Sequence, residues 1–546
     1  MSMFGDYKSY KKYYPTYSDW KQNRELMNAK REEYLRKNPT DFDLDDLQRS
    51  KTILRAIDVM DEYSQKRAED TEVATEFVIS NGLEIALAIG SILGVVISSL
   101  KPIKNALSKY TKKANHPEIV RTAIGGVAGA LVATLAAFPL FAWAARAEAK
   151  ASRKGRFESM RKDLSDPKTF AVLTPEQEAR LNENLAMLSV QKEKKNPFKS
   201  FGEGWRTVKE MVVDSPEYVY QKMLFEEELV KDAQHFDKEL SAQEIEDAKR
   251  DQQLLTKLVE KIDIASQDYA ENAELATSAL ITTGFAFSGL LTFAYEKLAK
   301  AMKWKVSSVP SIVGTLAMLG ATIYGASIQK QAARVGRFKA KQDLMKNPSQ
   351  LVYVKDEKTD EITDVQIKEE KKTNILKFLL EASKHNKEFK KWQKTEGARE
   401  KNLSKALENI ELTDEQYKDA LRLQHNTFKT FNKVDEKSQK YAESLEALGQ
   451  SIQYPISFIF STLGVVFGLK FLKGTEKAKT AAEMSLPLMK YMSVILLSTL
   501  PTVLINAFIT KEQKKASRVA DMLAINEMQD YRNFADYSKY KNSLQN

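Results

Sequence analysis

The chain has 546 residues and carries 84 Lys and Arg against 74 Asp and Glu, which gives a formal net charge of +10. It contains no Cys, so disulfides, thiolate catalysis and Cys-ligated metals are excluded, and its four His stand outside any metal-ligand spacing. The positive charge lies beside apolar segments and favours anionic lipids as partners over nucleic acid.

Apolar residues are concentrated in six stretches of about the length that a bilayer requires, roughly 20 residues. The stretches form three pairs: residues 85–100 with 122–145, 276–295 with 306–328, and 454–469 with 491–509. Their cores hold no charged residue, and a Lys or Arg at the centre of a membrane helix costs about 2.5–3.5 kcal/mol. The sequence therefore predicts an all-α, polytopic membrane protein with six transmembrane helices in three hairpins.

The polar segments between the apolar pairs are predicted to be long charged helices that form a bundle outside the membrane. In one of them an apolar stripe recurs at helical spacing, formed by Leu254, Leu255, Leu258, Ile262 and Ala265. The predicted division is a helical segment 1–78, hairpin 79–147, linker 148–273, hairpin 274–329, linker 330–450, hairpin 451–510 and helical tail 511–546. Basic residues follow the hairpins, so the positive-inside rule places the linkers and both termini in the cytoplasm. The hairpin tips are basic too, which leaves open a re-entrant arrangement.

A string D-x-x-S-Q-x-[RY]-A-E occurs three times, once before each apolar pair. Its leading residues are Asp61, Ser64 and Gln65, then Asp263, Ser266 and Gln267, then Asp435, Ser438 and Gln439. The recurrence predicts three duplicated units, that is, three internal repeats. Asp and Ser share one narrow helix face. That face suits either close contact between units or a polar vestibule lined by all three copies.

Matching residues also occur at the start of each unit, and capping residues and prolines indicate where helices begin and end. Upstream of the string, Asp247, Ala248 and Arg250 match Asp419, Ala420 and Arg422, with Asp45, Asp46 and Arg49 as a looser version in the first unit. Ser241 and Thr413 are predicted N-caps. The predicted helix stops are Asn38-Pro39, Asp166-Pro167 and Asn347-Pro348.

A second string follows each apolar pair. It reads Ala151-Ser152-Arg153 with Gly155-Arg156-Phe157, Ala332-Ala333-Arg334 with Gly336-Arg337-Phe338, and Ala516-Ser517-Arg518 with Ala520-Asp521-Met522, so the third copy is degraded. Its arginines are predicted either to anchor the membrane boundary by charge or to bind phospholipid headgroups. They are Arg153, Arg156, Arg334, Arg337 and Arg518.

No Walker motif, nucleophile elbow or paired catalytic carboxylates occur, so we predict no enzymatic activity, no cofactor and no metal site. The leading hypothesis is a non-enzymatic integral membrane scaffold, or membrane-organising protein, that anchors a cytoplasmic helical assembly surface. Its partners would be the lipid bilayer, rich in anionic lipid, and a protein or further copies of the chain bound through the linker helices. The alternative is a channel or transporter with pseudo-threefold internal symmetry, suggested by the repeat and by Pro139, Pro455 and Pro501 in the apolar segments.

Overall fold

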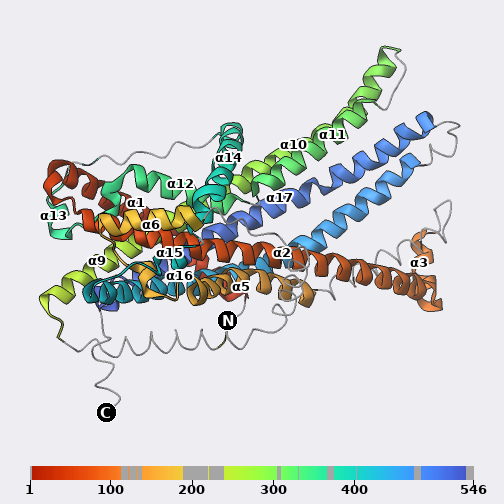
Figure 1. The fold of residues 1–546 in the computed structure, drawn as a ribbon. Helices are drawn as coiled ribbons and strands as arrows, with labels where there is room; N and C mark the ends of the chain where they lie inside the picture. The colour runs from red at the N-terminus through yellow and green to blue at the C-terminus, as the bar shows by residue number, and fades with distance from the viewer. Residues whose placement is uncertain are drawn as a thin grey trace.

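The computed structural model describes most of the chain, and every regular element in the described part is a helix (Figure 1). The described residues are 3–111, 138–188, 239–303, 309–329, 331–363, 374–400, 402–472 and 481–535, with the single residues 121, 132, 219 and 365. No strand occurs among these residues, so the predicted all-α class is confirmed.

Three long helices carry the repeated D-x-x-S-Q string. They are α2 (Leu44–Ser99), α9 (Ala242–Val259) continued through the π-helical turn η3 (Glu260–Ile264) into α10 (Ala265–Ala301), and α16 (Asp414–Leu472). The second string lies on the helices that return toward the body, namely α5 (Phe138–Lys162), α11 (Val309–Gln329) followed by α12 (Ala332–Lys346), and α17 (Ala481–Glu527). Each unit therefore brings an outgoing and a returning helix to the same place in the body.

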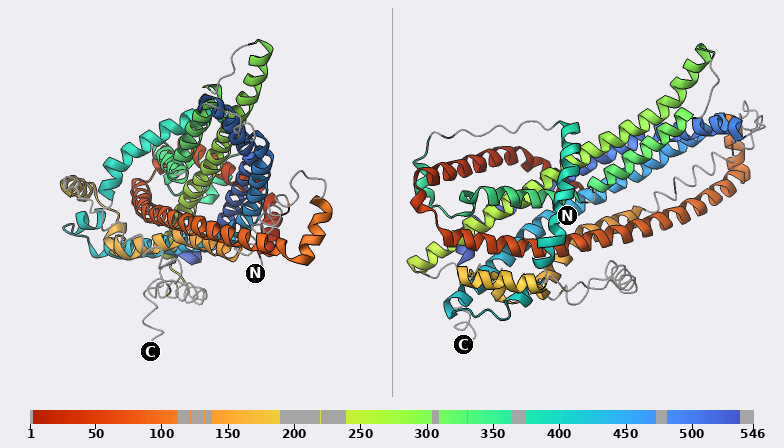
Figure 2. Two further views of the ribbon diagram at one scale, coloured as in Figure 1. Left: turned by 90° about the vertical axis from the view of Figure 1, so that its right-hand side faces the viewer. Right: turned by 45° about the horizontal axis from the view of Figure 1, so that its top comes forward.

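The other helical elements of the described part follow in chain order. They are α1 (Met3–Lys37), η1 (Pro39–Asp41), α3 (Lys101–Thr111), η2 (Pro167–Phe170), α6 (Pro175–Leu188), η4 (Pro348–Leu351), α13 (Asp356–Asp360), α14 (Ile375–Glu400), α15 (Leu403–Leu407) and η6 (Tyr531–Phe534). Figures 1 and 2 show two hairpins, α10 with α11 and α16 with α17, that leave the body, with the far part of α2 as a third projection. Lys490 of α17 forms an ion pair with Glu296 of α10, so the two hairpins remain in contact beyond the body.

Helix boundaries follow the capping residues in the sequence. The Ser241 side chain accepts a hydrogen bond from the Glu244 N–H in a capping box, and the Thr413 hydroxyl accepts one from the Gln416 N–H, so both predicted N-caps are confirmed. The three predicted proline stops also end helices, because α1, α5 and α12 each end before one and a 3-10 turn begins at Pro39, Pro167 and Pro348.

One hydrophobic core joins the three units. Ile53 and Ile57 of α2, Leu255 of α9 and Phe431 of α16 are buried in the same cluster. Phe170 and Phe534, from the turns η2 and η6, close it. The apolar stripe predicted around Leu255 therefore faces the other units.

The prediction of six transmembrane helices is wrong. Across the residues that the structure describes, no helix combines the length and the apolar content that crossing a bilayer requires. Part of the apolar sequence is used in contacts between helices: at the base of the second hairpin, Ala276 and Ile328 are buried in one cluster with Phe378 and Leu379 of α14. Most of residues 122–145, predicted as the second helix of the first hairpin, lie outside the described ranges.

The predictions that require spanning helices are corrected by the same finding. They are the polytopic fold class, the integral-membrane localisation with its cytoplasmic linkers, the membrane-scaffold function, and the channel or transporter alternative. The helices also continue through predicted domain boundaries: α2 through residues 78–79, α10 through 273–274, α16 through 450–451 and α17 through 510–511. Linker and hairpin are thus parts of the same helices.

Candidate functional site

The three repeated aspartates meet in the middle of the body. Asp61 of α2, Asp263 of η3 and Asp435 of α16 all contact Arg156 of α5: its Nη2 lies 3.6 Å from Asp61 Oδ1 and 3.9 Å from Asp263 Oδ1, and its Nη1 pairs with Asp435 Oδ1. Arg337 of α12 adds contacts of 2.6 Å to Asp61 and 3.4 Å to Asp263. We call these five residues the axial cluster. Both guanidinium groups connect different units.

Close helix contact places the two arginines in the axial cluster. A Cβ atom on Gly155 would lie 2.4 Å from the Tyr63 carbonyl oxygen and 2.7 Å from the Ser64 Cα. Only glycine allows this approach between α5 and α2. In the second unit, a Cβ on Gly336 would lie 2.9 Å from the Ser266 Cα. In these two units the Asp and Ser of the string thus face the returning helix of their own unit.

The serines hold that contact by hydrogen bonds. Ser64 and Ser152 share one of 2.5 Å between their hydroxyl oxygens, and the Ser266 hydroxyl donates to the Ala333 carbonyl over 3.0 Å. Ser152 and Ala333 are matching positions of the second string. Ser438 of α16 is half-buried, as is Gln65 of α2, and the Gln439 side chain lies outside the described part.

The third unit differs from the first two at the arginine position. Asp521 of α17 stands where the other units have Arg156 and Arg337, and its Oδ2 accepts a hydrogen bond of 2.8 Å from the Gln267 amide. Ala520, next to it, replaces the close-contact glycine and is fully buried. Four described carboxyl groups, counting Asp521, therefore surround two guanidinium groups.

Burial changes the protonation of these carboxyl groups, and their mutual repulsion adds to its effect. Burial raises the pKa of Asp61 to about 6, although Arg337 and Arg156 oppose the rise. Burial also raises the pKa of Asp435, and it raises that of Asp521 well above the usual range. The cluster therefore retains protons at pH values where exposed carboxyl groups have lost them.

The remaining predicted arginines also have partners within the protein. Arg153 is buried, donates to Asn432 Oδ1 over 3.1 Å and lies over the Phe157 ring, and Arg518 pairs with Asp268 and Glu271. Arg334 is half-buried on α12. A phospholipid headgroup could reach the guanidinium groups of Arg153 or Arg518 only by displacing these partners, and the headgroup role stays a prediction.

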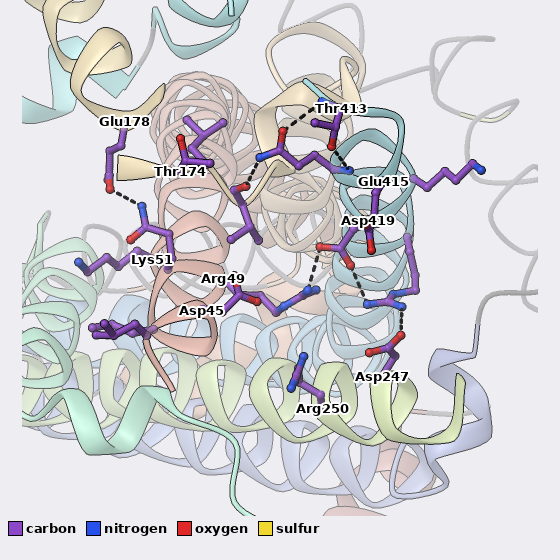
Figure 3. Close-up of a pocket in the computed structure, with 18 of the residues that line it drawn as sticks. Asp45, Arg49, Lys51, Thr174, Glu178, Asp247, Arg250, Thr413, Glu415 and Asp419 are labelled. Atoms are coloured by element: carbon purple, nitrogen blue, oxygen red, sulfur yellow. Dashed lines mark hydrogen bonds and ion pairs between the residues drawn. The ribbon is translucent and has the colours of Figure 1, made fainter. Parts of the chain in front are cut away.

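A cavity of about 860 Å³ lies where the units begin, between the first turns of α2, α6, α9 and α16 (Figure 3). Asp45, Asp247 and Asp419, which match one another in the three units, line this helix-start pocket. Arginines join the units here as well: Arg49 Nη2 lies 2.8 Å from Asp419 Oδ2, and Arg422 Nη1 lies 2.9 Å from Asp247 Oδ2. The pocket is thus bounded by ion pairs between units.

Charges around the helix-start pocket balance. The lining includes five cationic side chains and five carboxylates, which are Arg49, Lys51, Arg250, Lys418 and Arg422 against Asp45, Glu178, Asp247, Glu415 and Asp419. Among the described residues, no group of His, Cys, Asp or Glu could hold a metal ion. The pocket therefore offers no net charge with which to select an ion.

A different kind of surface lies on the α10–α11 hairpin. Large apolar side chains follow one another along α11 and are exposed: Val313 by 51%, Leu316 by 62%, Leu319 by 50%, Ile323 by 63% and Tyr324 by 36%. Gly320 lies among them, and no atom lies within 4 Å of the place that its Cβ would occupy. We call these five apolar side chains the α11 stripe. The sequence interpretation assigned this segment to a membrane helix and so missed it as a protein surface, although its spacing is visible in the sequence.

Comparison with protein-family models, with curated proteins and with solved structures found no match for this chain. The function is therefore inferred from the surfaces and clusters described above.

Proposed function

We propose that this protein is a non-enzymatic structural assembly protein that forms a dimer through the α11 stripe. The observation that carries the proposal is the row of exposed large apolar side chains along one face of α11. Contiguous exposed apolar surface marks an interaction site more often than isolated exposed residues do. Self-association was among the partners expected from the sequence, and the hairpin gives it a specific surface.

The spacing of the stripe supports a helix as the occupant. Val313, Leu316 and Leu319 precede Gly320, and Ile323 and Tyr324 follow it, so apolar residues extend to both sides of a position without a side chain. Small residues let two helices approach closely where they cross. In a two-fold dimer each helix presents the same patch to the other. Two α11 helices that cross antiparallel at Gly320 would place Leu316 of each copy beside Tyr324 of the other.

The size of the stripe favours a weak dimer. The helix has 21 residues and is about 31 Å long at 1.5 Å per residue. Completing the burial of a half-exposed side chain of this size is worth about 1 kcal/mol, and a two-fold contact counts each of the five twice. The resulting gain, on the order of 10 kcal/mol, lies within the range of about 4–15 kcal/mol that association costs. Against the lowest of these costs about 6 kcal/mol remains, which corresponds to a dissociation constant of roughly tens of micromolar.

Charge repulsion opposes the dimer. Each copy carries a formal net charge of +10, and α14, with its exposed lysines, packs at the base of the same hairpin. Salt screens such repulsion, with a Debye length of about 8 Å at physiological ionic strength. Added salt should therefore strengthen the dimer, which is the opposite of what an association driven by ion pairs would show.

The paired charges support a structural role for the body. Arg156, Arg337, Arg49 and Arg422 each pair with aspartates from more than one unit. Groups held in this way stabilise the arrangement of helices. The rigid body then fixes the orientation of the α10–α11 hairpin.

Sedimentation velocity over a hundredfold range of protein concentration tests the proposal. We expect wild-type protein to shift from monomer to dimer, and Leu316→Glu to remain monomeric. The matched control is Leu463→Glu, which places the same charge on an exposed apolar position of the α16 helix in the other hairpin and should leave the dimer intact.

A Leu316→Glu protein that still dimerises would contradict the proposal, and two further outcomes would overturn it. One is a wild-type protein that stays monomeric at every concentration. The other is loss of association in both variants together with open-ended polymers of the wild type, because that result would mean that the α11 stripe binds the α16 surface of the next copy.

A further inference from the structure

A basic face on α14 lies apart from the axial cluster and the helix-start pocket. Six lysines are exposed along this helix, namely Lys377, Lys384, Lys387, Lys390, Lys391 and Lys394. At 100° per residue they occupy an arc of roughly 140° that contains no Asp or Glu. We call them the α14 lysine face.

The helix is held so that this face points away from the protein. Phe378, Leu379 and Ala382 are buried against α10, and Phe389 lies against Phe338 of α12 and against Trp392. The Tyr324 hydroxyl of α11 donates a 3.1 Å hydrogen bond to the Leu379 carbonyl. Because these contacts fix the rotation of α14, the lysine face is already arranged before any partner binds.

Few of these lysine charges are neutralised within the described part of the chain. Glu381 lies 3.8 Å from Lys377 and Glu388 lies 3.9 Å from Lys384, both at one edge of the arc. Lys377 and Lys384 are nevertheless 72% and 75% exposed. The six lysines and two glutamates together leave a local charge of +4.

We propose that the α14 lysine face binds an anionic lipid surface as a peripheral contact, with no helix entering the bilayer. Lysine ammonium groups act as compact point charges and suit a broad layer of headgroups, whereas arginine is preferred for bidentate phosphate recognition. The six positions lie within 18 residues, from Lys377 to Lys394, or about 25 Å of helix, so they reach many headgroups at once. This inference goes beyond the proposed dimer and does not depend on it.

One apolar residue within the lysine arc favours lipid over nucleic acid. Leu380 is 68% exposed and lies between the lysines on the helix surface. A leucine can enter the layer between headgroups and acyl chains while the neighbouring lysines remain among the headgroups. Against a phosphate backbone the same leucine would stay in contact with water and contribute nothing.

Vesicle flotation with the full chain tests the inference, with phosphatidylcholine vesicles compared with vesicles that also contain phosphatidylglycerol. We expect binding only to the second kind, and weaker binding as salt is added. The double variant Lys384→Glu with Lys391→Glu should lower the partition into these vesicles by at least roughly 25-fold, because each lysine near an anionic leaflet contributes about fivefold.

The matched control carries the same change of charge elsewhere. Lys346→Glu with Lys440→Glu alters two exposed lysines on α12 and α16 and should bind vesicles nearly as the wild type does. An equal loss in this control would overturn the inference, since it would show an effect of net charge alone. Binding to pure phosphatidylcholine would overturn it too, as would tighter binding of a DNA duplex that the α14 variant abolishes.

The variant Leu316→Glu separates this site from the proposed dimer. If it remains monomeric and still binds phosphatidylglycerol vesicles, both proposals stand. If the variant no longer binds these vesicles, the α11 stripe and not α14 makes the lipid contact, and the α14 inference is wrong.

Discussion

Asp521 has a carboxyl group at the position where the first two units have a guanidinium group. The residue is buried and accepts a hydrogen bond from Gln267 of the second unit. Burial raises the pKa of Asp521 well above its usual range, the nearby Asp263 carboxylate raises it further, and the Gln267 hydrogen bond lowers it. A neutral side chain that can still accept this hydrogen bond should therefore suit the site better than a carboxylate does.

The sign of the pH dependence follows from the raised pKa values. A carboxyl group that binds its proton more tightly in the folded state stabilises the fold below its unfolded pKa, near 3.9, and loses that contribution as pH rises through its folded pKa. For Asp61 the folded pKa is about 6. The axial cluster should therefore contribute more stability at about pH 4 than above about pH 6.

We predict that Asp521→Asn raises the free energy of unfolding at about pH 8 by about 1–3 kcal/mol and has little effect near pH 4. Urea unfolding followed by circular dichroism at the two pH values measures the difference. Asp530→Asn is the control: the hydrogen bond from Arg532 lowers the pKa of Asp530, so this change should destabilise the protein at the higher pH. A less stable Asp521→Asn protein at pH 8 would contradict the prediction.

Single residues were only partly predictable from the sequence. The repeated Asp, Ser and Gln could be found because each motif recurs at the same place before an apolar pair. The pairing of Asp61 with Arg337 joins residues of different units, and no local pattern indicates it. The sequence alone indicates that Asp521 is a degraded position of the motif, because it shows aspartate in place of arginine. It does not show that the carboxyl groups of Asp61, Asp263 and Asp435 lie nearby.

At the scale of helices, substituting a glycine by alanine tests how closely two neighbouring helices approach each other. A Cβ on Gly336 would lie 2.9 Å from the Ser266 Cα, whereas one on Gly320 would meet no atom within 4 Å. We predict that Gly336→Ala destabilises the protein by about 1–3 kcal/mol, because α12 must move away from η3 and α10. Gly320→Ala should stabilise it by up to about 1 kcal/mol through helix propensity.

Thermal unfolding of the two variants, at a concentration too low for association, compares the same substitution in two helices. Equal effects would mean that the close approach of α12 to Ser266 contributes nothing to stability. The proposed dimer allows a second measurement with the same variants. At high protein concentration, Gly320→Ala should weaken association while Gly336→Ala should not.

Helix ends and helix type were predictable, but the environment of the apolar segments was not. Ser241, Thr413 and the three proline stops mark the observed boundaries because capping is a local interaction. A long charge-free apolar helix has the same composition whether it faces lipid or other helices. At Ala276 and Ile328 the neighbours are α14 and its phenylalanine, which lie about 50 to 100 residues away in sequence.

Across the whole molecule, ion pairs join the units at two levels. The axial cluster connects α2, η3, α16, α5 and α12, and the helix-start pocket connects α2, α9 and α16 through Arg49 and Arg422. The hydrophobic core of Ile53, Leu255 and Phe431 belongs to the same three helices. Cooperative unfolding of the body should therefore depend on the charged contacts as well as on the core.

Arg156 provides the most direct test, because it alone among the described residues contacts the repeated aspartate of all three units. Removing one partner of a buried ion pair leaves uncompensated charge and costs about 3–5 kcal/mol. We predict that Arg156→Gln lowers the free energy of unfolding by this amount near pH 8, and that lowering the pH to about 5 restores part of the loss by protonating the aspartates.

Hydrogen exchange of the Arg156→Gln protein should show α2, α10 and α16 opening separately, where the wild type opens all three together. Arg36→Gln serves as the control, since Arg36 is exposed and, within the described part of the chain, pairs only with Glu33 of its own helix. If Arg156→Gln still exchanged as one cooperative body, the hydrophobic core alone would account for the joining of the units.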